Sequence, residues 1–256
     1  MADGDLSDDI VKPEIRNGGS RMITTAVHEV RIPVDRISID GDLVIPPGAR
    51  ALVLFAHGSG SSRKSPRNRY VAERLHRASL ATLLMDLLTP SEERIDLVDA
   101  RLRFDIPFLA ERLRAATAWV AKQKDLASLP IGYFGASTGA AAALVAAAET
   151  RSRVRAIVSR GGRPDLASSA LSAVQAPTLL IVGGDDRQVL QLNRMALEAL
   201  RCEKGLVVVP GATHLFEESG ALEEVARLAA EWFCGHLDSL GWAPTESELS
   251  TSIRGE

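Results

Sequence analysis

The sequence predicts an α/β fold with a mostly parallel central sheet and helices on both faces. Short runs of apolar, β-forming residues alternate with longer helix-forming segments between residues 51 and 237, and repeated strand-helix units of this kind form open parallel sheets. Residues 51–56 (ALVLFA) are continuously apolar, which is typical of a strand buried on both faces. A chain of 256 residues is long enough for one sizeable core, so we expect a single domain.

The expected elements can be assigned in order along the chain. Residues 27–33 and 37–45 alternate apolar and polar side chains, which favours an antiparallel pair at the sheet edge, with Asp40-Gly41 as a turn or bulge. After the buried strand 51–56, the expected strands are 81–86, 130–134, 154–159, 178–182 and 206–209, and the expected helices are 67–79, 104–123, 138–148, 165–174, 189–200 and 221–237. Sites in such sheets lie at the carboxyl ends of the strands.

The two ends of the chain differ in composition from the rest. Residues 1–21 are rich in Asp, Gly, Ser and Asn, and residues 239–256 are polar and without periodicity. Segments with so little apolar surface to bury are expected to be disordered. We therefore expect a disordered leader, one α/β domain over residues 22–238 and a disordered tail.

Composition excludes several classes of partner. Charged residues make up 25% of the chain, both signs are interspersed and the formal net charge is -3, so the sequence predicts neither nucleic-acid binding nor membrane attachment. The first ten residues hold four aspartates, and no apolar stretch reaches spanning length, so we expect a cytoplasmic location. Cys202 and Cys234 suit two reduced thiols better than a disulfide or a metal site.

A Gly-x-Ser-x-Gly motif contains the candidate nucleophile. Gly135, Ser137 and Gly139 follow the expected strand 130–134 and precede the alanine-rich helix 138–148. A serine on a sharp strand-to-helix turn projects toward a separate base and lies beside a backbone N–H that can receive an oxyanion. The alternative is a glycine-containing loop with a serine helix cap. The position between strand and helix favours the nucleophile.

Two later strand ends supply partners for Ser137. Asp185 and Asp186 follow one expected strand, and His214 follows the next. A histidine there could take the serine proton as general base, and a carboxylate could hold its imidazole in the required tautomer. Taken singly, a strand-end aspartate is more often a turn former and a lone histidine is more often structural. Serine, aspartate and histidine in this order at strand ends predict a catalytic triad.

The glycine-rich segment 57–60 follows the buried strand and can offer a second oxyanion donor. The Ser59 N–H would act with the Thr138 N–H as an oxyanion hole. The competing interpretation is a phosphate-binding loop, but Arg63 stands where that pattern needs its second glycine, which argues against nucleotide binding. We expect His57 to order this loop by hydrogen bonding.

These motifs make the chain resemble the α/β-hydrolase superfamily and, within it, the dienelactone hydrolase-like branch. The resemblance covers residues 27–237 and rests on His57-Gly58-Ser59-Gly60, Gly135-Ala136-Ser137-Thr138-Gly139, Gly183-x-x-Asp186-x-x-Val189 and Gly211-Ala212-Thr213-His214-Leu215-Phe216. It implies Asp186 as the triad carboxylate, with Asp185 as the alternative. The chain has Ser137 where dienelactone hydrolases proper carry cysteine. Residues 159–177 leave room for one short helix, which implies that no cap domain is present.

The resemblance implies a serine hydrolase that cleaves a carboxylic ester or lactone through an acyl-serine intermediate, with no cofactor and no metal ion. The alternative is a hydrolase-fold binding or interaction module that recognises a ligand without turnover, because fold alone does not determine function. An intact triad favours the enzyme. The expected partner is a small-molecule ester or lactone, and the sequence does not specify an oligomeric state.

Two features near the predicted site concern the substrate. Arg160 and Arg163 follow the strand 154–159, and arginine suits bidentate capture of a carboxylate. The alternative is that these arginines pair with neighbouring acids such as Asp165. Residues 89–103 form the longest connection on the active edge, and long connections are commonly lids; the alternative is a solvated loop or a helix extension.

Overall fold

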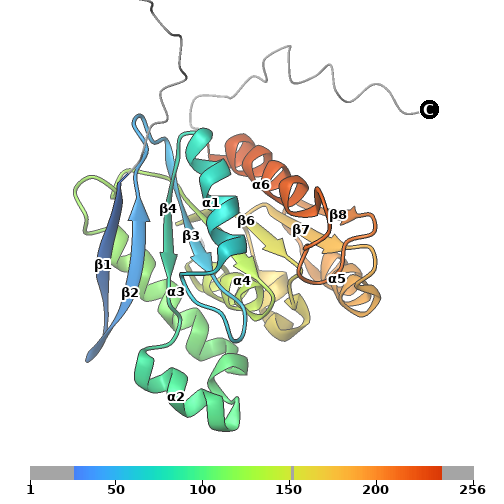
Figure 1. Ribbon diagram of the computed structural model, residues 1–256, viewed down its shortest axis with the longest axis horizontal. Coiled ribbons are helices and arrows are strands. Elements are labelled where there is room, and N and C mark those ends of the chain that lie inside the picture. Colours follow the sequence, from blue (N-terminus) through green and yellow to red (C-terminus); the bar gives the residue numbers. More distant parts are fainter. Residues whose placement is uncertain (1–25, 151–152, 238–256) are drawn as a thin grey trace, which may run out of the picture.

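The computed structural model describes residues 26–150 and 153–237, and its strands are β1 (Val27–Val34), β2 (Ile37–Val44), β3 (Ala51–Ala56), β4 (Leu80–Met85), β5 (Ile131–Ala136), β6 (Val154–Arg160), β7 (Thr178–Gly183) and β8 (Lys204–Val209). They form one sheet in the order β1-β2-β4-β3-β5-β6-β7-β8 (Figure 1). β2 pairs antiparallel with β1 and β4, and the remaining pairs are parallel. The predicted α/β fold with an antiparallel edge is confirmed. The predicted leader, 1–21, and tail, 239–256, lie outside the described residues.

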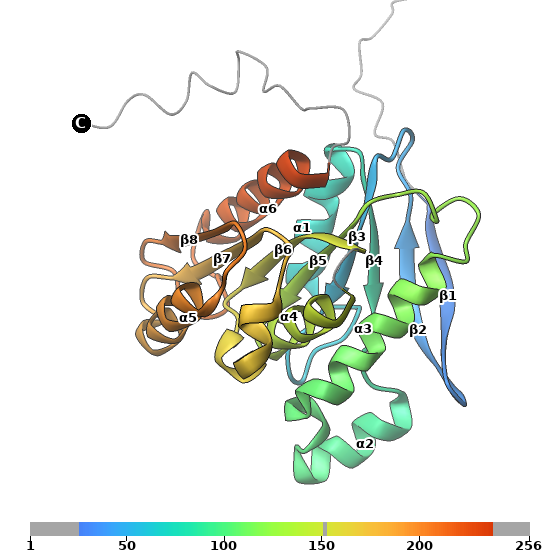
Figure 2. The same ribbon diagram turned by 180° about the vertical axis from the view of Figure 1, so that it is seen from behind.

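Helices cover both faces of the sheet, as predicted (Figure 2). They are α1 (Pro66–Arg77), α2 (Pro90–Asp99), α3 (Ile106–Val120), α4 (Thr138–Thr150), α5 (Arg187–Ala199) and α6 (Ala221–Leu237), with 3₁₀ segments η1 (Leu102–Phe104) and η2 (Pro164–Ala173). Buried residues of α1 and α6 form one apolar cluster with one face of the sheet. Those of α3, α4, α5 and η2 form the other.

Local capping sets where two of the helices begin. Ser65 Oγ accepts a hydrogen bond from the Asn68 N–H at 3.3 Å, and Pro66 occupies the first turn of α1. Thr89 and Glu92 exchange side-chain to backbone hydrogen bonds in a capping box that begins α2. Both arrangements satisfy N–H groups that have no partner inside a helix.

The hairpin between β1 and β2 turns earlier than the sequence suggests. Asp40-Gly41 was expected as a turn or bulge, but both residues lie inside β2. The turn lies at Asp35, whose φ is +48°. Gly41 is instead crowded by neighbouring side chains, since a Cβ there would lie 2.9 Å from Leu83 Cδ1 and 3.1 Å from Val30 Cγ2. Crowding by neighbouring strands, and not a turn, explains this glycine.

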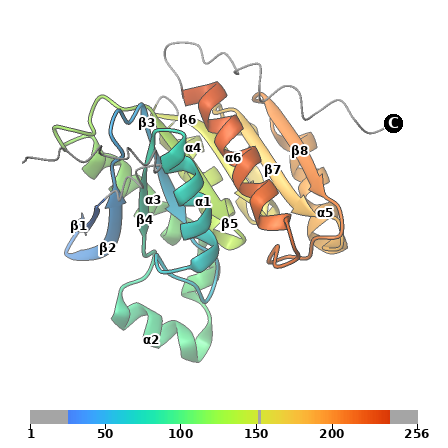
Figure 3. The same ribbon diagram turned by 45° about the horizontal axis from the view of Figure 1, so that its top comes forward.

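Two connecting segments also differ in detail from the expectation. The predicted helix 165–174 is the 3₁₀ segment η2, which is interrupted at Ser168 (φ +45°, ψ -122°). Residues 89–103 contain α2, which projects from the body of the fold (Figure 1, Figure 3). Ion pairs hold α2 in place, with Arg103 Nε 2.6 Å from Asp96 Oδ2 and Arg112 Nη2 2.7 Å from Glu92 Oε1.

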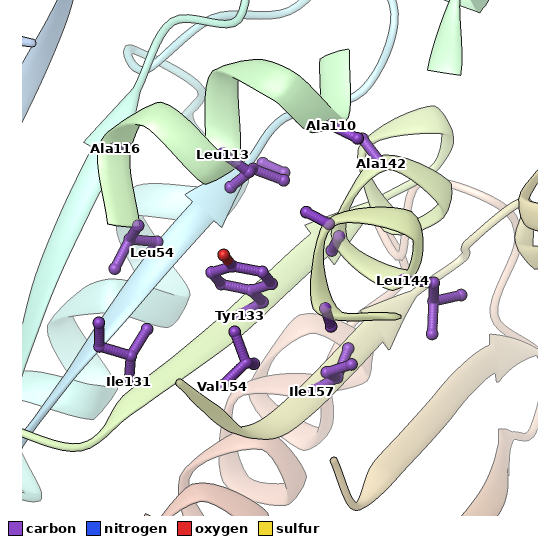
Figure 4. Close-up of a cluster of buried hydrophobic side chains, with 14 of the residues drawn as sticks. Leu54, Ala110, Leu113, Ala116, Ile131, Tyr133, Ala142, Leu144, Val154 and Ile157 are labelled. Atoms are coloured by element: carbon purple, nitrogen blue, oxygen red, sulfur yellow. The ribbon is translucent and has the colours of Figure 1, made fainter. Parts of the chain in front are cut away.

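Tyr133 lies at the centre of the larger apolar cluster (Figure 4). The side chain is fully buried between β5 and the helices α3 and α4. Its hydroxyl is 2.6 Å from Thr117 Oγ1, and the Thr117 hydroxyl donates to the Leu113 carbonyl, so the tyrosine is the donor between the two. Burial raises the pKa of Tyr133 to about 12, which keeps the hydroxyl protonated.

We expect Tyr133→Phe to lower the free energy of unfolding by about 1 kcal/mol, because one buried hydrogen bond is lost while Thr117 keeps its own acceptor. Leu54→Ala in the same cluster should cost about 2–5 kcal/mol, because it leaves a cavity. Urea unfolding of both variants measures the two losses. A Tyr133→Phe variant as stable as the original protein would show that the hydroxyl pair contributes nothing.

Candidate active site

Ser137 lies on the sharp turn between β5 and α4. Its φ is +51°, a strained conformation for a residue with a side chain. The glycines on either side make the turn possible. A Cβ on Gly135 would lie 2.4 Å from Ala140 Cα, and a Cβ on Gly139 would lie 2.3 Å from the Ala56 carbonyl oxygen. The motif is therefore a steric requirement of packing a helix directly against two strands.

His214 is hydrogen-bonded to Asp186. His214 Nδ1 and Asp186 Oδ2 are 2.7 Å apart. Asp186 follows β7 and precedes the first turn of α5, whereas His214 lies in the loop after β8. Asp185, the alternative carboxylate, uses its backbone N–H to bond the Ala212 carbonyl, and no side-chain contact joins it to His214. The structure thus brings Asp186, and not Asp185, to the imidazole.

The imidazole also lies close to the Ser137 turn. The Ser137 N–H donates to the Arg160 carbonyl at 3.3 Å, and the next residue on that strand end is Gly161. A Cβ on Gly161 would be 3.6 Å from His214 Cε1. Within the described residues no hydrogen bond joins Ser137 Oγ to His214, and such bonds often tighten only when substrate binds.

The two candidate oxyanion donors lie side by side. Ser59 Oγ and Thr138 Oγ1 are 3.0 Å apart, so their hydroxyls tie the loop after β3 to the start of α4. A Cβ on Gly58 would lie 3.0 Å from Ser137 Cβ, which shows how closely this loop approaches the serine. In the described part of the chain, no hydrogen bond uses the backbone N–H of Ser59 or Thr138. Both donors remain available to a ligand.

His57 connects this loop to the end of β4. His57 Nδ1 is 2.9 Å from the Gly58 carbonyl, and Nε2 is 3.0 Å from the Leu87 nitrogen. Only a neutral ring protonated on Nδ1 satisfies both contacts, because Nε2 must accept the Leu87 N–H. Burial lowers the pKa of His57, which favours this neutral form. His57 orders the loop, as the sequence led us to expect.

Arg63, which departs from the phosphate-loop pattern, is engaged by two acids. Its Nε donates to Asp42 Oδ1 at 3.1 Å, and its backbone N–H donates to Asp86 Oδ1 at 2.7 Å. Lys64 and Arg69 also bond Asp42, at 2.8 and 3.2 Å. Burial alone would raise the pKa of Asp42, but the hydrogen bonds from these three cations outweigh it and lower the pKa. These ion pairs hold in place the end of the loop that leads into α1.

A pocket opens beside the candidate oxyanion donors. Its lining includes the loop 57–62, Thr138 and, from α2, Asp96 and Leu97. Leu97 is 73% exposed, so an apolar side chain stands at the edge of the pocket and is available to a substrate. The segment considered as a lid or loop is therefore a helix that forms one wall of this pocket.

The two arginines considered for substrate binding differ in their bonding partners. Arg163 donates Nε and Nη2 to the two carboxylate oxygens of Asp165 at 2.9 and 2.8 Å, and these bonds raise its pKa. Arg160 is buried and has no such partner among the described residues. Arg67, which sequence reasoning missed, lies close enough to affect Arg160 electrostatically. The helix-start signal Ser65-Pro66 could have placed Arg67 at this edge of the sheet.

The described residues form neither a metal site nor a disulfide nor a membrane-spanning helix. Between residues 26–150 and 153–237, no group of three His, Cys, Asp or Glu side chains could hold a metal ion. Cys202 and Cys234 are not joined by a disulfide. The helices of these ranges are too short or too polar to span a bilayer.

The chain is similar to hydrolases of known structure. Its sequence matches the model of the alpha/beta hydrolase family over residues 19–228. A crystal structure of dienelactone hydrolase from Anabaena variabilis shares 60% sequence identity and a TM-score of 0.82, over 83% of this chain and 99% of that chain. Est1E from Butyrivibrio proteoclasticus shares 17% identity and a TM-score of 0.67, over 80% of this chain and 97% of that chain, which shows the fold alone.

Curated relatives carry a different kind of name. Two proteins from strains of Mycobacterium tuberculosis, provisionally named phosphoribosyl transferase, are 59% identical to this chain over 210 residues. The match covers 82% of this chain and 46% of those proteins, so the chain spans about half the length of these relatives. That name describes the longer proteins as a whole.

We expect the free energy of unfolding to fall as the pH drops below about 6.5, the ordinary pKa of histidine. Below that pH the unfolded chain is stabilised by protonation of His57, whereas the fold favours the neutral ring. The folded-state pKa is lowered, so this stabilisation is present above the unfolded-state pKa and lost as the pH falls through the folded one. His57→Gln should flatten the dependence, measured by urea unfolding between about pH 5 and 7. His28→Gln, at an exposed histidine on β1, is the matched control; equal slopes in both variants would contradict the assignment.

Proposed function

Because this chain belongs to the alpha/beta hydrolase family and is dienelactone hydrolase-like, we propose that it is a serine hydrolase that cleaves a carboxylic ester or lactone. The observation that carries the proposal is the bonded pair of His214 and Asp186 beside a serine on a strained strand-to-helix turn. A binding protein has no physical need for a serine held at positive φ next to an oriented imidazole.

In the proposed acylation step, Ser137 Oγ attacks the carbonyl carbon of the ester. The serine proton passes to His214 Nε2, since Nδ1 faces Asp186 at 2.7 Å. Asp186 accepts the Nδ1–H bond, holds the ring in the tautomer with a free Nε2 and stabilises the imidazolium that forms. The bond to the leaving oxygen then breaks, and His214 returns its proton to the alcohol.

The negative charge of the tetrahedral intermediate falls on the former carbonyl oxygen. The N–H groups of Ser59 and Thr138 are proposed to receive it, which is supported by their lack of other hydrogen bonds among the described residues. Because the hydroxyls of these two residues bond each other at 3.0 Å, the donors are held in place before substrate arrives. Donors fixed in advance need no reorganisation during the reaction.

Deacylation repeats the same chemistry with water as the nucleophile. His214 takes a proton from the water, the hydroxide attacks the acyl carbon, and the proton returns to Ser137 Oγ as the acid leaves. The proposed cycle uses these groups and water alone, so it requires no cofactor or metal ion. We propose a small-molecule ester or lactone as the substrate and the cytoplasm as the location.

The alternative function is a hydrolase-fold module that binds a ligand without turnover. A fluorophosphonate probe separates the two, because it labels only a serine whose oxygen is activated by a base. We expect stoichiometric labelling of Ser137 and hydrolysis of simple aryl esters. Ser137→Ala, His214→Ala and the double variant should each lose about 10⁴-fold or more in kcat, with no additivity. Absence of both labelling and hydrolysis would favour the binding module.

The two neighbouring aspartates give a matched test of the carboxylate role. Asp186→Asn should lower kcat by about 10⁴-fold, because an amide no longer holds His214 in the working tautomer. Asp185→Asn should leave kcat close to the original value, since its contact to the Ala212 carbonyl uses the backbone N–H. Steady-state kinetics on one aryl ester measures both. A larger loss in Asp185→Asn than in Asp186→Asn would show the assignment to be wrong.

A further inference from the structure

Arg160 is a buried cation without an ion-pair partner. Within residues 26–150 and 153–237, a charge is carried by these buried side chains: Asp42, Asp96, Arg112 and Arg160. The other three are ion-paired. Arg160 forms no ion pair with any described residue, and its Nε and Nη1 are buried without a hydrogen-bond partner. Because an unpaired buried charge is costly, packing alone does not explain this side chain.

The charge of Arg160 persists at neutral pH and has a second cation beside it. Burial, and after it the repulsion from Arg67, lowers the pKa of Arg160 to about 10. The side chain is therefore still a cation at pH 7. The geometry agrees, because a Cβ on Gly161, the residue after Arg160, would lie 3.3 Å from Phe216 Cε2, and Glu217, the residue after Phe216, pairs with Arg67.

Arg160 adjoins the turn that carries the candidate nucleophile, and Arg67 belongs to a helix on the same face of the sheet. The Arg160 carbonyl accepts the Ser137 N–H, so this residue adjoins the turn. Side chains alternate along a strand, and Val158, two residues earlier, packs into the apolar cluster formed with α1 and α6. Arg160 therefore points to the same face as Val158. Arg67 lies in the first turn of α1, where the positive end of the helix dipole favours an anion.

Glu217 already places a negative charge next to this pair of cations. Its Oε1 is 3.0 Å from Arg67 Nη1, and the two side chains are 64% and 31% exposed. Glu217 lies three residues after His214, so the ion pair connects the start of α1 to the loop that carries the candidate base. An ion pair this exposed contributes little stability, and an incoming anion can displace the carboxylate.

We propose that Arg160 and Arg67 bind a phosphate monoester group carried by the substrate. This substrate assignment rests on the proposed hydrolase function, and the phosphate is bound and not transferred. Two guanidiniums, one from the end of β6 and one from the first turn of α1, match the charge of about -1.5 to -2 that a phosphate monoester carries at pH 7. A carboxylate would neutralise only one of the two cations. Guanidinium also suits the several acceptor oxygens of phosphate.

Inorganic phosphate tests the site without any need for turnover. Titration calorimetry with Ser137→Ala protein should detect phosphate binding, and adding Arg160→Met should weaken it about tenfold or more, because charge-assisted hydrogen bonds are lost. Adding Glu217→Gln instead should tighten binding, since the competing carboxylate is gone. Arg155→Met is the matched control, an exposed arginine at the other end of β6. No phosphate binding, or acetate bound as tightly as phosphate, would overturn the assignment.

Thermal unfolding separates a ligand site from a structural arginine. Without phosphate, Arg160→Met should raise Tm by about 2–4 °C, because it removes an unpaired buried charge. A lower Tm would show that Arg160 serves packing, and would count against the proposal. Phosphate should raise the Tm of the original protein and not that of Arg160→Met.

Kinetics with two esters connects the site to substrate choice. An aryl acetate bearing a phosphate monoester should be preferred over the neutral aryl acetate, and Arg160→Met should lower the ratio of the two kcat/KM values about tenfold or more. Equal kcat/KM for both esters in the original enzyme would overturn the substrate assignment and leave the hydrolase function intact. Phosphate binding with no hydrolysis of either ester would instead overturn the hydrolase function.

Discussion

The close approach of β5 and α4 is the constraint on which the rest of the site depends. Side chains at Gly135 and Gly139 would overlap backbone atoms of the helix and of β3, so the turn closes only with hydrogen at both positions. That turn holds Ser137 at positive φ. Because β3 and β6 flank β5 in the sheet, the loop with the proposed oxyanion donor Ser59 and the strand end with Arg160 lie on either side of it. The imidazole of His214, oriented by Asp186, completes the group of side chains around this turn.

Sequence patterns predict the parallel part of the sheet well, because burial on both faces leaves continuous apolar runs such as Ala51–Ala56. They also predict which strand ends carry the candidate site residues, since parallel strands deliver their carboxyl ends to one edge. They do not distinguish Asp185 from Asp186 by residue type, because both occupy the same loop and offer the same carboxylate. Family resemblance favours Asp186, and the backbone geometry explains why it is the one that contacts His214.

The features that sequence does not predict arise from contacts between distant segments. The sequence suggests a turn at Gly41, yet the atom that most crowds this position belongs to Leu83 on another strand. α2 has one buried residue, Asp96, so it lacks the apolar periodicity that announces a helix. The electrostatic interaction between Arg67 and Arg160 is invisible in the sequence, because the two residues lie on α1 and β6, far apart along the chain. Motifs reveal local chemistry, and tertiary packing decides which groups meet.

The order of the strands has a consequence for how the protein is made. His214 follows β8, which lies at the sheet edge and is the last strand among the described residues. A ribosome therefore releases the segment with the serine well before the segment with the histidine. Until β8 pairs with β7, a nascent chain holds a strained serine with no base beside it. In the proposed mechanism such a chain cannot hydrolyse an ester, so activity would begin only once β8 has joined the sheet.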